Sequence, residues 1–517
     1  MKKNLAYTSL LVTIVMVLGY FLSFVKEATV AKYYGVSSLV DAYTIALTIP
    51  VTLFALVSVA IQSVVIPIYS DILYKCNKDE ANHYINGLIS VVAVISIALI
   101  GLFELTASPL VTLFAPGFDS ETHSLAVKLL RLCLPVILFS LVDKIFLGLL
   151  NVHKQFIWPS IAIYFQNIAI ICAIIFLHEQ FGIVAACIGQ IIGEGIQFAF
   201  LLLLATKYYY YEFVFEIKNP NIIKSLKNSF PIMWSISVAE ICAVINRAVA
   251  SFLFAGSIAA LGYASKLNGV LISFFTAAVS TIIYPLFAES SSKNNIEQLN
   301  KRFNFILSSY TFFLIPLMLW VLCYKSEIVE VVFARGAFDQ DAISITQSLF
   351  GCYVVGIIFM AFRETITKVF YSLHDTKTPA VNATIGVVIN IVLNLTLPFI
   401  LGVEGLAIAT SVTAAIISCR LILQLVKRND GINLSYFKTN FIPVAMASGL
   451  MLISLLVLDK FTNDLLPLVK LTIGGIVGVL IFILAAAIFK TPIYSGMKQM
   501  IITKKENSQK GDANNNG

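Results

Sequence analysis

The chain repeats itself at a spacing of 220 residues. Three pairs of turn-forming residues share this spacing: Asp119 and Asp339, Pro159 and Pro379, Gly182 and Gly402. Long apolar stretches surround all of them, so the repeated unit contains several helices that could cross a membrane. A repeated multi-helix unit in an apolar chain is typical of a two-lobed transporter, in which substrate binds where the lobes meet. The repeat therefore predicts transport rather than catalysis.

Composition places the chain in a membrane. Hydrophobic residues make up 59% of the 517 positions, charged residues 12%, and the mean hydropathy is +0.89. Soluble proteins carry about 25% charged residues. The net charge of +7 does not indicate a nucleic-acid partner, because basic residues gathered in short loops between helices are what membrane insertion produces.

About fourteen apolar stretches are long enough to cross ~30 Å of hydrocarbon. We therefore predict an all-α integral membrane protein with two pseudo-symmetric six-helix lobes and two further C-terminal helices. The predicted parts are an N-lobe at 1–215, a C-lobe at 216–430, the two further helices at 431–492 and a disordered cytoplasmic tail at 493–517. Lys and Arg gather in alternate loops, which predicts a multi-pass protein of the plasma membrane with both termini in the cytoplasm.

Charged residues at membrane depth are costly and usually face a polar interior. We predict a cavity role for five charged residues: Lys26, Asp41, Arg247, Lys266 and Arg363. The first two flank a short turn at Gly35, and Arg247 and Lys266 flank its counterpart at Gly256. A cationic cavity of this kind suits an anionic substrate such as a phosphate or diphosphate.

Other charges in the apolar stretches are interpreted as structural ion pairs or as side chains that reach the interface. These are Glu104, Arg131, Asp143, Lys144, Glu289, Lys368 and Arg420. Asp143-Lys144 and Arg363-Glu364 are adjacent opposite charges at equivalent places in the two repeats. Neighbours on a helix point about 100° apart, so at least one member of each pair needs another partner.

A cation site is a further hypothesis. Buried carboxylates of transporters bind Na⁺ or H⁺, and nearby amides and hydroxyls can complete an oxygen-rich site. The candidate groups are Glu240, Asn246, Asn382, Asn390 and Thr410. The alternative is that these polar groups only hydrogen-bond neighbouring helices.

The sequence predicts no enzyme, no metal site and no organic cofactor. It contains no phosphate-binding loop and no HExxH motif, and its eight cysteines show no CxxC spacing. Asp119 and Asp339 follow glycine-containing turns and are predicted to cap the next helix. Coupling to Na⁺, to H⁺ or to the membrane potential would supply the energy.

Four stretches carry a resemblance to a known family. They are Phe24-Val-Lys-Glu-Ala-Thr-Val-Ala-Lys-Tyr-Tyr-Gly35 with Asp41-Ala-Tyr, Leu150-Asn-Val-His-Lys-Gln-Phe-Ile-Trp-Pro159, Phe333-Ala-Arg-Gly-Ala-Phe-Asp339, and Phe370-Tyr-Ser-Leu-His-Asp-Thr-Lys-Thr-Pro379. Together they resemble the MurJ/MviN family of the MOP exporter superfamily. The resemblance implies two six-helix lobes, two helices that form a lipid-tail groove, and flipping of lipid II for peptidoglycan synthesis. Its implied partners are lipid II, membrane lipids and cell-wall synthesis proteins.

The same resemblance implies roles for single residues. Lys26 matches the family's cationic position in the first helix, and Asp41 matches its aspartate at the start of the second. Ala264-Ser-Lys-Leu267 keeps the basic residue of a family motif at Lys266 but has Ser265 in place of the acid, and a nearby acid falls at Gly269. These departures keep one alternative open, a Wzx-like flippase for another polyprenyl-diphosphate-linked oligosaccharide. A MATE-type cation-coupled antiporter is a weaker alternative, because it would need an acid-dominated cavity and normally has only twelve spans.

Overall fold

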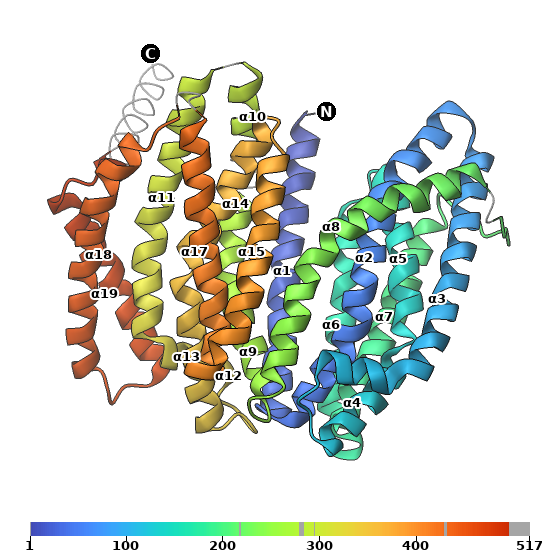
Figure 1. Ribbon diagram of the computed structural model, residues 1–517, viewed down its shortest axis with the longest axis horizontal. Helices are drawn as coiled ribbons and strands as arrows, with labels where there is room; N and C mark the ends of the chain where they lie inside the picture. Colours follow the sequence, from blue (N-terminus) through green and yellow to red (C-terminus); the bar gives the residue numbers. More distant parts are fainter. Residues whose placement is uncertain (1, 217–218, 279–283, 294, 429–431, 496–517) are drawn as a thin grey trace, which may run out of the picture. The chain divides into compact units, whose positions relative to one another are not determined.

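The computed structural model describes residues 2–216, 219–278, 284–293, 295–428 and 432–495. Every regular element within these ranges is a helix, labelled in Figure 1. The prediction of an all-α protein is therefore confirmed. The predicted tail lies outside the described residues from position 496 onward.

The helices form two compact units, Met1–Tyr263 with Arg335–Ala342, and Ala264–Ala334 with Ile343–Gly517. The first unit contains α1 (Lys2–Tyr34), α2 (Ser38–Lys75), α3 (Lys78–Phe114), α4 (Ser120–Cys133), α5 (Val136–Val152), α6 (Ile157–Phe181), α7 (Val184–Ala205), α8 (Pro220–Ala250) and the start of α9 (Ser257–Ala278). Contacts thus group α8 with the first seven helices, whereas the lobe boundary near residue 215 stays a prediction.

The second unit contains the remainder of α9 and the later helices, except the first turn of α13. These are α10 (Tyr284–Ser292), α11 (Ile296–Cys323), α12 (Lys325–Phe333), α13 (Gln340–Val355), α14 (Ile357–Ser372), α15 (Lys377–Thr396), α16 (Pro398–Leu401), α17 (Glu404–Lys427), α18 (Ser435–Phe461) and α19 (Pro467–Ile488).

Among the described residues, nine helices are long and apolar enough to cross a membrane, or up to eleven if each bent helix pair forms one span. The bent pairs are α4 with α5, at 43°, and α13 with α14, at 40°. Pro135 starts the second half of the first pair and Gly356 that of the other. Both residues interrupt a helix, proline because it lacks an N–H and glycine through its low helix propensity. The chain is thus a multi-pass membrane protein whose bent spans occupy matching places in the two repeats.

The backbone conformation of single turns is also repeated. After α5, Lys154 has φ 59°, and after α14, His374 has φ 60°. In each turn the next N–H bonds back to a carbonyl five residues earlier, at 2.9 Å in both cases. This is the Schellman arrangement, which satisfies carbonyls at the end of a helix. Two turns 220 residues apart therefore share one geometry although their side chains differ.

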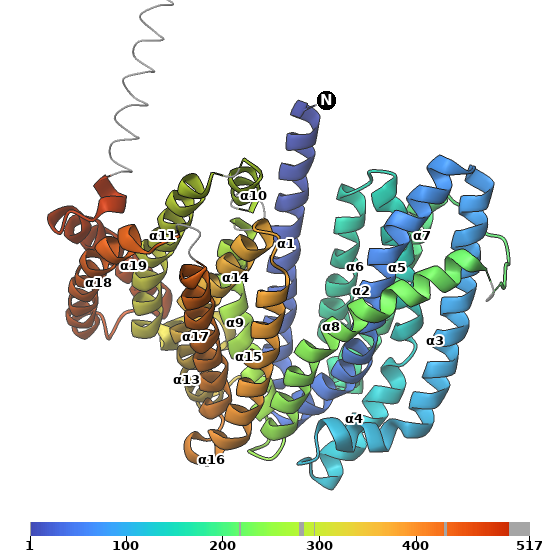
Figure 2. The same cartoon turned by 45° about the horizontal axis from the view of Figure 1, so that its top comes forward.

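Apolar side chains fill the interior of each unit. In the first unit, α2 packs against α3, α4, α5 and α8, and buries large residues such as Ile45, Ile49 and Tyr69. In the second unit, Phe303 and Leu307 of α11 pack with Phe370 of α14 and Leu421 of α17. Figure 2 shows α18 and α19 beside α11.

A buried charge cluster fastens α19 to its neighbours within the second unit. The Lys470 ammonium lies 2.6 Å from Glu327 of α12 and 2.7 Å from Asp459 of α18. The Lys470 side chain is only 10% exposed. Two carboxylates around one buried ammonium make a multiply bonded ion pair, which helps to fix α18 and α19 against α12. Sequence analysis did not identify this cluster.

The predicted helix caps differ between the repeats. The Asp339 carboxylate accepts a hydrogen bond of 2.8 Å from the Ala342 N–H, so this prediction is confirmed. Asp119 occupies the N-cap position of α4 but makes no capping bond to the backbone. Its pKa is nevertheless lowered, mainly by a hydrogen bond from the Thr122 hydroxyl.

Candidate functional site

Asp41, at the start of α2, holds the turn between α8 and α9. Its carboxylate oxygens accept hydrogen bonds from the backbone N–H groups of Gly256, at 2.7 Å, and Ala259, at 2.8 Å. The residue is 2% exposed. The first N–H groups of a helix have no partner within it, and a carboxylate there also faces the positive end of the helix dipole. Asp41 therefore caps α9 from a distant part of the sequence.

The α1–α2 turn is tied back in the same region. The Tyr263 hydroxyl of α9 donates to the Gly35 carbonyl at 3.2 Å. A Cβ at Gly256 would lie 2.8 Å from the Val36 carbonyl oxygen, and φ at Gly256 is +96°. Only glycine fits such a close approach in this backbone conformation. The two turns at Gly35 and Gly256, which the sequence paired, are therefore in contact.

Each of these turns also contacts a loop from the other repeat. The Ala337 N–H donates to the Lys32 carbonyl at 2.8 Å, next to Gly336 with φ +65°. The Gly117 N–H donates to the Ser251 hydroxyl at 2.9 Å. We call the two turns and the loops 115–119 and 334–339 the turn cluster. It is held largely by backbone groups, and the Asp41 carboxylate accepts two of its hydrogen bonds.

The predicted cations lie in different surroundings. The Lys26 ammonium is 3.2 Å from the neighbouring Glu27 carboxylate, and the Lys26 side chain is 20% exposed. Arg247 is half-buried near the end of α8, with a guanidinium nitrogen 3.5 Å from the Ala243 carbonyl. Lys266 of α9 and Arg363 of α14 are exposed and belong to the second unit. Substrate binding by these residues stays a prediction.

The polar groups of the predicted cation site form hydrogen bonds with other residues of the helices. Glu240 and Asn246 lie on α8, in the first unit, whereas the other three groups lie in the second unit. There, the Asn382 amide donates to Gln424 at 2.6 Å. The Asn390 carbonyl accepts from Asn394 at 2.8 Å, and the Thr410 hydroxyl donates to the Leu406 carbonyl at 3.2 Å.

These bonds fit the alternative, in which the polar groups only hydrogen-bond their neighbours. The Asn382 bond joins α15 to α17, and the other two bonds each lie within one helix. No group of three His, Cys, Asp or Glu side chains that could hold a metal ion occurs in the part of the chain that the structure describes. Sequence analysis did not predict that Gln424 bonds to Asn382, because the sequence around a single amide in an apolar stretch does not show which residue it contacts. Cation binding at these groups stays a prediction.

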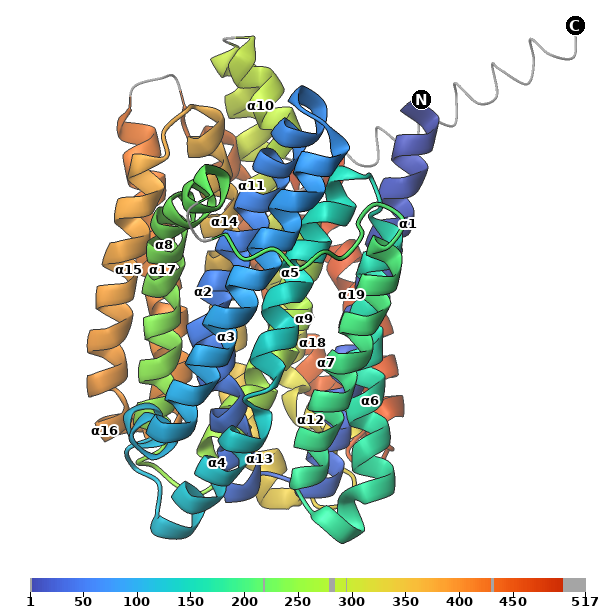
Figure 3. The same cartoon turned by 90° about the vertical axis from the view of Figure 1, so that its right-hand side faces the viewer.

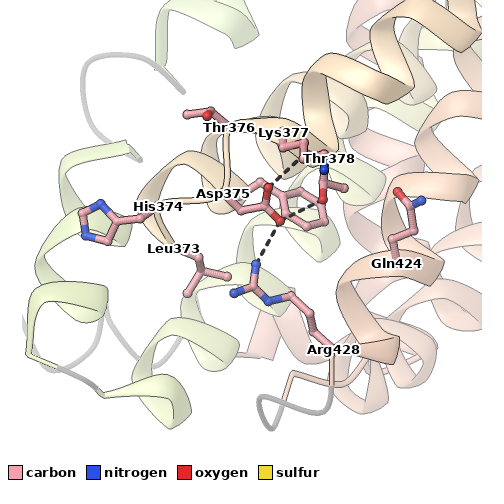
Figure 4. Close-up of a pocket in the computed structure, with 9 residues that line it drawn as sticks. Leu373, His374, Asp375, Thr376, Lys377, Thr378, Gln424 and Arg428 are labelled. Atoms are coloured by element: carbon pink, nitrogen blue, oxygen red, sulfur yellow. Dashed lines mark hydrogen bonds and ion pairs between the residues drawn. The ribbon is translucent and has the colours of Figure 1, made fainter.

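A pocket of about 510 Å³ opens at the turn between α14 and α15 (Figure 4). The Arg428 guanidinium lies 3.1 Å from the Asp375 carboxylate, which also accepts hydrogen bonds from the Thr378 N–H and hydroxyl. Burial alone would raise the pKa of Asp375, but the Thr378 bonds and the Arg428 charge lower it below its ordinary value. The turn thus carries a fixed ion pair where α14 and α17 end and α15 begins.

The equivalent turn of the first repeat is neutral. Gln155 matches Asp375 in position, and Tyr208 matches Arg428. The Gln155 amide donates to the Tyr208 hydroxyl at 3.1 Å. The Tyr208 ring stacks on His153, with ring centroids 4.1 Å apart. The same positions therefore contact each other in both repeats, through an ion pair in one and a neutral hydrogen bond in the other.

Comparisons with known proteins cover nearly the whole chain. The family model described as lipid II flippase MurJ matches residues 30–484. A relative from Thermosipho africanus, named lipid II flippase MurJ, is 29% identical over 487 residues, which are 94% of this chain and 97% of the relative. A relative from Thermotoga maritima, named probable lipid II flippase MurJ, is 25% identical over 80% of this chain and 82% of its own length.

Solved structures agree with this assignment. A structure of lipid II flippase MurJ in an inward closed conformation has a TM-score of 0.79 and 28% identity, and covers 93% of this chain and 98% of that one. An inward-facing MATE transporter of the MOP superfamily has a TM-score of 0.65 at 15% identity, covering 80% of this chain and 94% of its own. The second likeness shows a shared fold alone. Because the family model spans both repeats and most of the chain, the protein belongs to the MurJ family.

Proposed function

We propose that this protein flips lipid II, the undecaprenyl-diphosphate-linked peptidoglycan precursor, from the inner to the outer leaflet of a bacterial inner membrane. The observation that carries the proposal is the match of the MurJ family model to residues 30–484, which include both repeats. The family description names a flippase, which confirms the prediction of a transporter rather than an enzyme.

The substrate's diphosphate would bind to cations that line the transport cavity. Lys26 and Lys266 are the first candidates, with Arg247 and Arg363 as further ones. The exposure of Lys266 supports this role, because an ammonium that water reaches is also accessible to phosphate oxygens. The lipid tail would stay in the membrane along α18 and α19, which the Lys470 cluster holds to α12.

The turn cluster would close one end of the cavity during part of an alternating-access cycle. Four segments meet there through a few hydrogen bonds, and in such a cycle they would separate and re-form. Asp41 would then act on transport through the closed state, by capping α9, in addition to its predicted contact with substrate. This role needs no change in the covalent or charge state of the protein.

A membrane potential could drive the cycle without a nucleotide. Each elementary charge that crosses the field changes the free energy by about 2.3 kcal/mol per 100 mV. A cation site at Glu240, Asn246, Asn382, Asn390 and Thr410 would be a second energy source. The clustering of basic residues in alternate loops supports cytoplasmic positions for both termini.

The second candidate is a flippase for another polyprenyl-diphosphate-linked oligosaccharide. Ser265 and Gly269 favour it, because they stand where the family resemblance leads us to expect acids. The diphosphate would still meet Lys266, but the sugar would meet different side chains. A MATE-type antiporter has less support, since that likeness rests on 15% identity.

The test is complementation. A bacterium depleted of its own lipid II flippase would express this chain, and labelling would measure lipid II at the outer face of the membrane. Restored growth with lipid II at the outer face supports the proposal. Inserted protein with lipid II still on the inside would reject lipid II as substrate and favour the other glycan. A Lys26→Ala, Lys266→Ala double variant should insert normally and flip at least about tenfold more slowly, since two charge-assisted contacts are removed.

A further inference from the structure

The first unit contains two buried carboxylates at the middle of neighbouring membrane helices. Asp143 lies midway along α5, and Glu194 lies midway along α7. Asp143 is 0% exposed and Glu194 is 7% exposed. Figure 3 shows α5, α6 and α7 side by side, and α7 packs against both of the others. Neither acid belongs to the predicted substrate cradle or cation site.

Three glutamine amides hydrogen-bond to these acids, and one of them, Gln197, contacts both. The Gln197 amide nitrogen donates to the Asp143 carboxylate at 2.7 Å and lies 3.4 Å from the Glu194 carboxylate. The Gln166 amide of α6 donates to the other Glu194 oxygen at 2.6 Å, and Gln190 lies 3.4 Å from the same oxygen. Because one nitrogen contacts both acids, their nearest oxygens lie within about 6 Å of each other.

One oxygen of this group has no donor. The Oδ1 atom of Asp143 is buried and makes no hydrogen bond, whereas the other three carboxylate oxygens each face an amide N–H. A buried oxygen that carries negative charge without a donor is strongly unfavourable. A proton on this oxygen removes the charge, and no other carboxylate oxygen of the pair is left free for it.

The nearby cation does not balance both acids. Lys144 is the cation next to Asp143 in the sequence, on α5. It follows Asp143 on α5 and so points about 100° away from it. No carboxylate of the described residues lies within ion-pair distance of its ammonium. Two acids against one lysine leave one negative charge at membrane depth, where an unbalanced charge is expensive.

We propose that Asp143 and Glu194 together hold one exchangeable proton, on Asp143, as a cation site of the first repeat. Asp143 has no water-accessible surface, so this proton is occluded in the present conformation. It could leave or enter only when α5, α6 and α7 move. The site therefore couples proton binding to conformation, and as a coupling site it rests on the proposed flippase function.

The matching positions of the second repeat carry no pair of acids. The positions 220 residues beyond Asp143, Lys144 and Glu194 are Arg363, Glu364 and Ala414. Position 417, which matches Gln197, is Ile417. A proton-binding pair in one repeat thus corresponds to a permanent cation in the other, which fits a division of labour between energy coupling and anion binding.

The direct test is infrared spectroscopy of the full-length protein in vesicles of phosphatidylethanolamine and phosphatidylglycerol. The stretching band of a protonated carboxyl should be present near neutral pH and should disappear in Asp143→Asn. Asn is close to protonated aspartic acid in size, so the variant should remain folded, which a melting curve checks. The matched control is Glu104→Gln, which removes a half-exposed carboxylate paired with Arg131 at 3.2 Å. This control should leave the band unchanged.

Two further variants sharpen the assignment. Gln197→Leu keeps both acids but removes the amide that contacts them, so the band should shift without being lost. A band that survives Asp143→Asn overturns the proposal. A band lost only in Glu194→Gln would place the proton on Glu194 and would overturn its assignment to Asp143. Loss of the band when Na⁺ replaces K⁺ at constant pH would identify a sodium site instead, and would also overturn it.

Transport provides a separate measurement. In the same vesicles with lipid II, flipping by the unaltered protein should vary with pH by up to about tenfold per unit, as expected for one controlling proton. Asp143→Asn should flip at a rate that does not depend on pH. If the band behaves as expected but the unaltered protein does not flip lipid II, the proposed function fails while the proton site stands. If flipping occurs with equal pH dependence in Asp143→Asn, the coupling role is rejected.

Discussion

The two repeats share their backbone turns but not the chemistry of their side chains. The turns after α5 and α14 have φ values of 59° and 60° at residues 220 apart. The residue that follows each of these forms a neutral hydrogen bond in one repeat, between Gln155 and Tyr208, and an ion pair in the other, between Asp375 and Arg428. Backbone geometry depends on a few helix-ending positions, whereas each side-chain contact can change alone. Duplication has therefore preserved the fold and allowed the sites to diverge.

The largest effect is expected at Asp41, which has no acidic counterpart in the second repeat. Asp41→Ala should lower the stability of the protein by about 3 kcal/mol, because two buried N–H groups lose a charged acceptor. Thermal unfolding of purified protein measures this. Asp339→Ala is the matched control, since its exposed carboxylate caps α13 through one bond, and it should cost about 1 kcal/mol. Equal costs for the two variants would show that Asp41 does not fasten the turn cluster.

A smaller effect, equal in both repeats, is expected at Gly182 and Gly402. Their φ values are 55° and 61°, with ψ of −137° and −144°. Side chains disfavour this region, so Gly182→Ala and Gly402→Ala should each cost about 2 kcal/mol by backbone strain. Neither new methyl group would meet an atom within 3.6 Å. Thermal unfolding would again be measured.

The control for the glycine pair is Gly101→Ala, on α3, where a Cβ meets nothing within 4 Å. Alanine is the better helix former, so this variant should be neutral or slightly stabilising. If Gly182→Ala and Gly402→Ala lower the stability by very different amounts, backbone strain does not contribute equally at the two turns.

The ion pair should make the stability of the second turn sensitive to acid. The pKa of Asp375 is lower in the folded protein than its unfolded value of about 3.9. Its carboxylate therefore stabilises the fold above that pH, and the stabilisation is lost as pH falls through the lower, folded value. Asp375 and Arg428 are 22% and 36% exposed, so the contribution should stay below about 1 kcal/mol.

The measurement is the difference in melting temperature between the unaltered protein and Asp375→Asn, followed from neutral pH to acid. The difference should shrink at low pH. Gln155→Ala, at the matching position of the first repeat, removes no carboxylate, so its effect on the melting temperature should not vanish at low pH. A pH-independent difference for Asp375→Asn would mean that the Arg428 contact does not stabilise the folded state.

The sequence predicted the features that repeat and missed those that occur once. Helix class and the pairing of the turns at Gly35 and Gly256 followed from apolar length and from spacing, which are properties of long segments. Partners could not be predicted, because contacts such as Gln197 with Asp143 or Lys470 with Glu327 join helices far apart in the sequence. Asp143 was interpreted as a structural ion-pair residue; the structure instead shows it bonded to an amide, with one oxygen unpartnered.

The smallest effect is expected where the first repeat has its neutral contact. Tyr208→Phe removes the hydroxyl that accepts from Gln155 but keeps the ring that stacks on His153. A partly exposed neutral hydrogen bond contributes about 0.5 kcal/mol, so the melting temperature should fall only slightly. Tyr208→Ala also removes the stacking and should cost about 1 kcal/mol more. If Tyr208→Phe costs as much as Tyr208→Ala, the hydroxyl rather than the ring stabilises this turn. The first repeat would then depend on one polar contact as the second depends on Arg428, and the difference between them would lie only in charge.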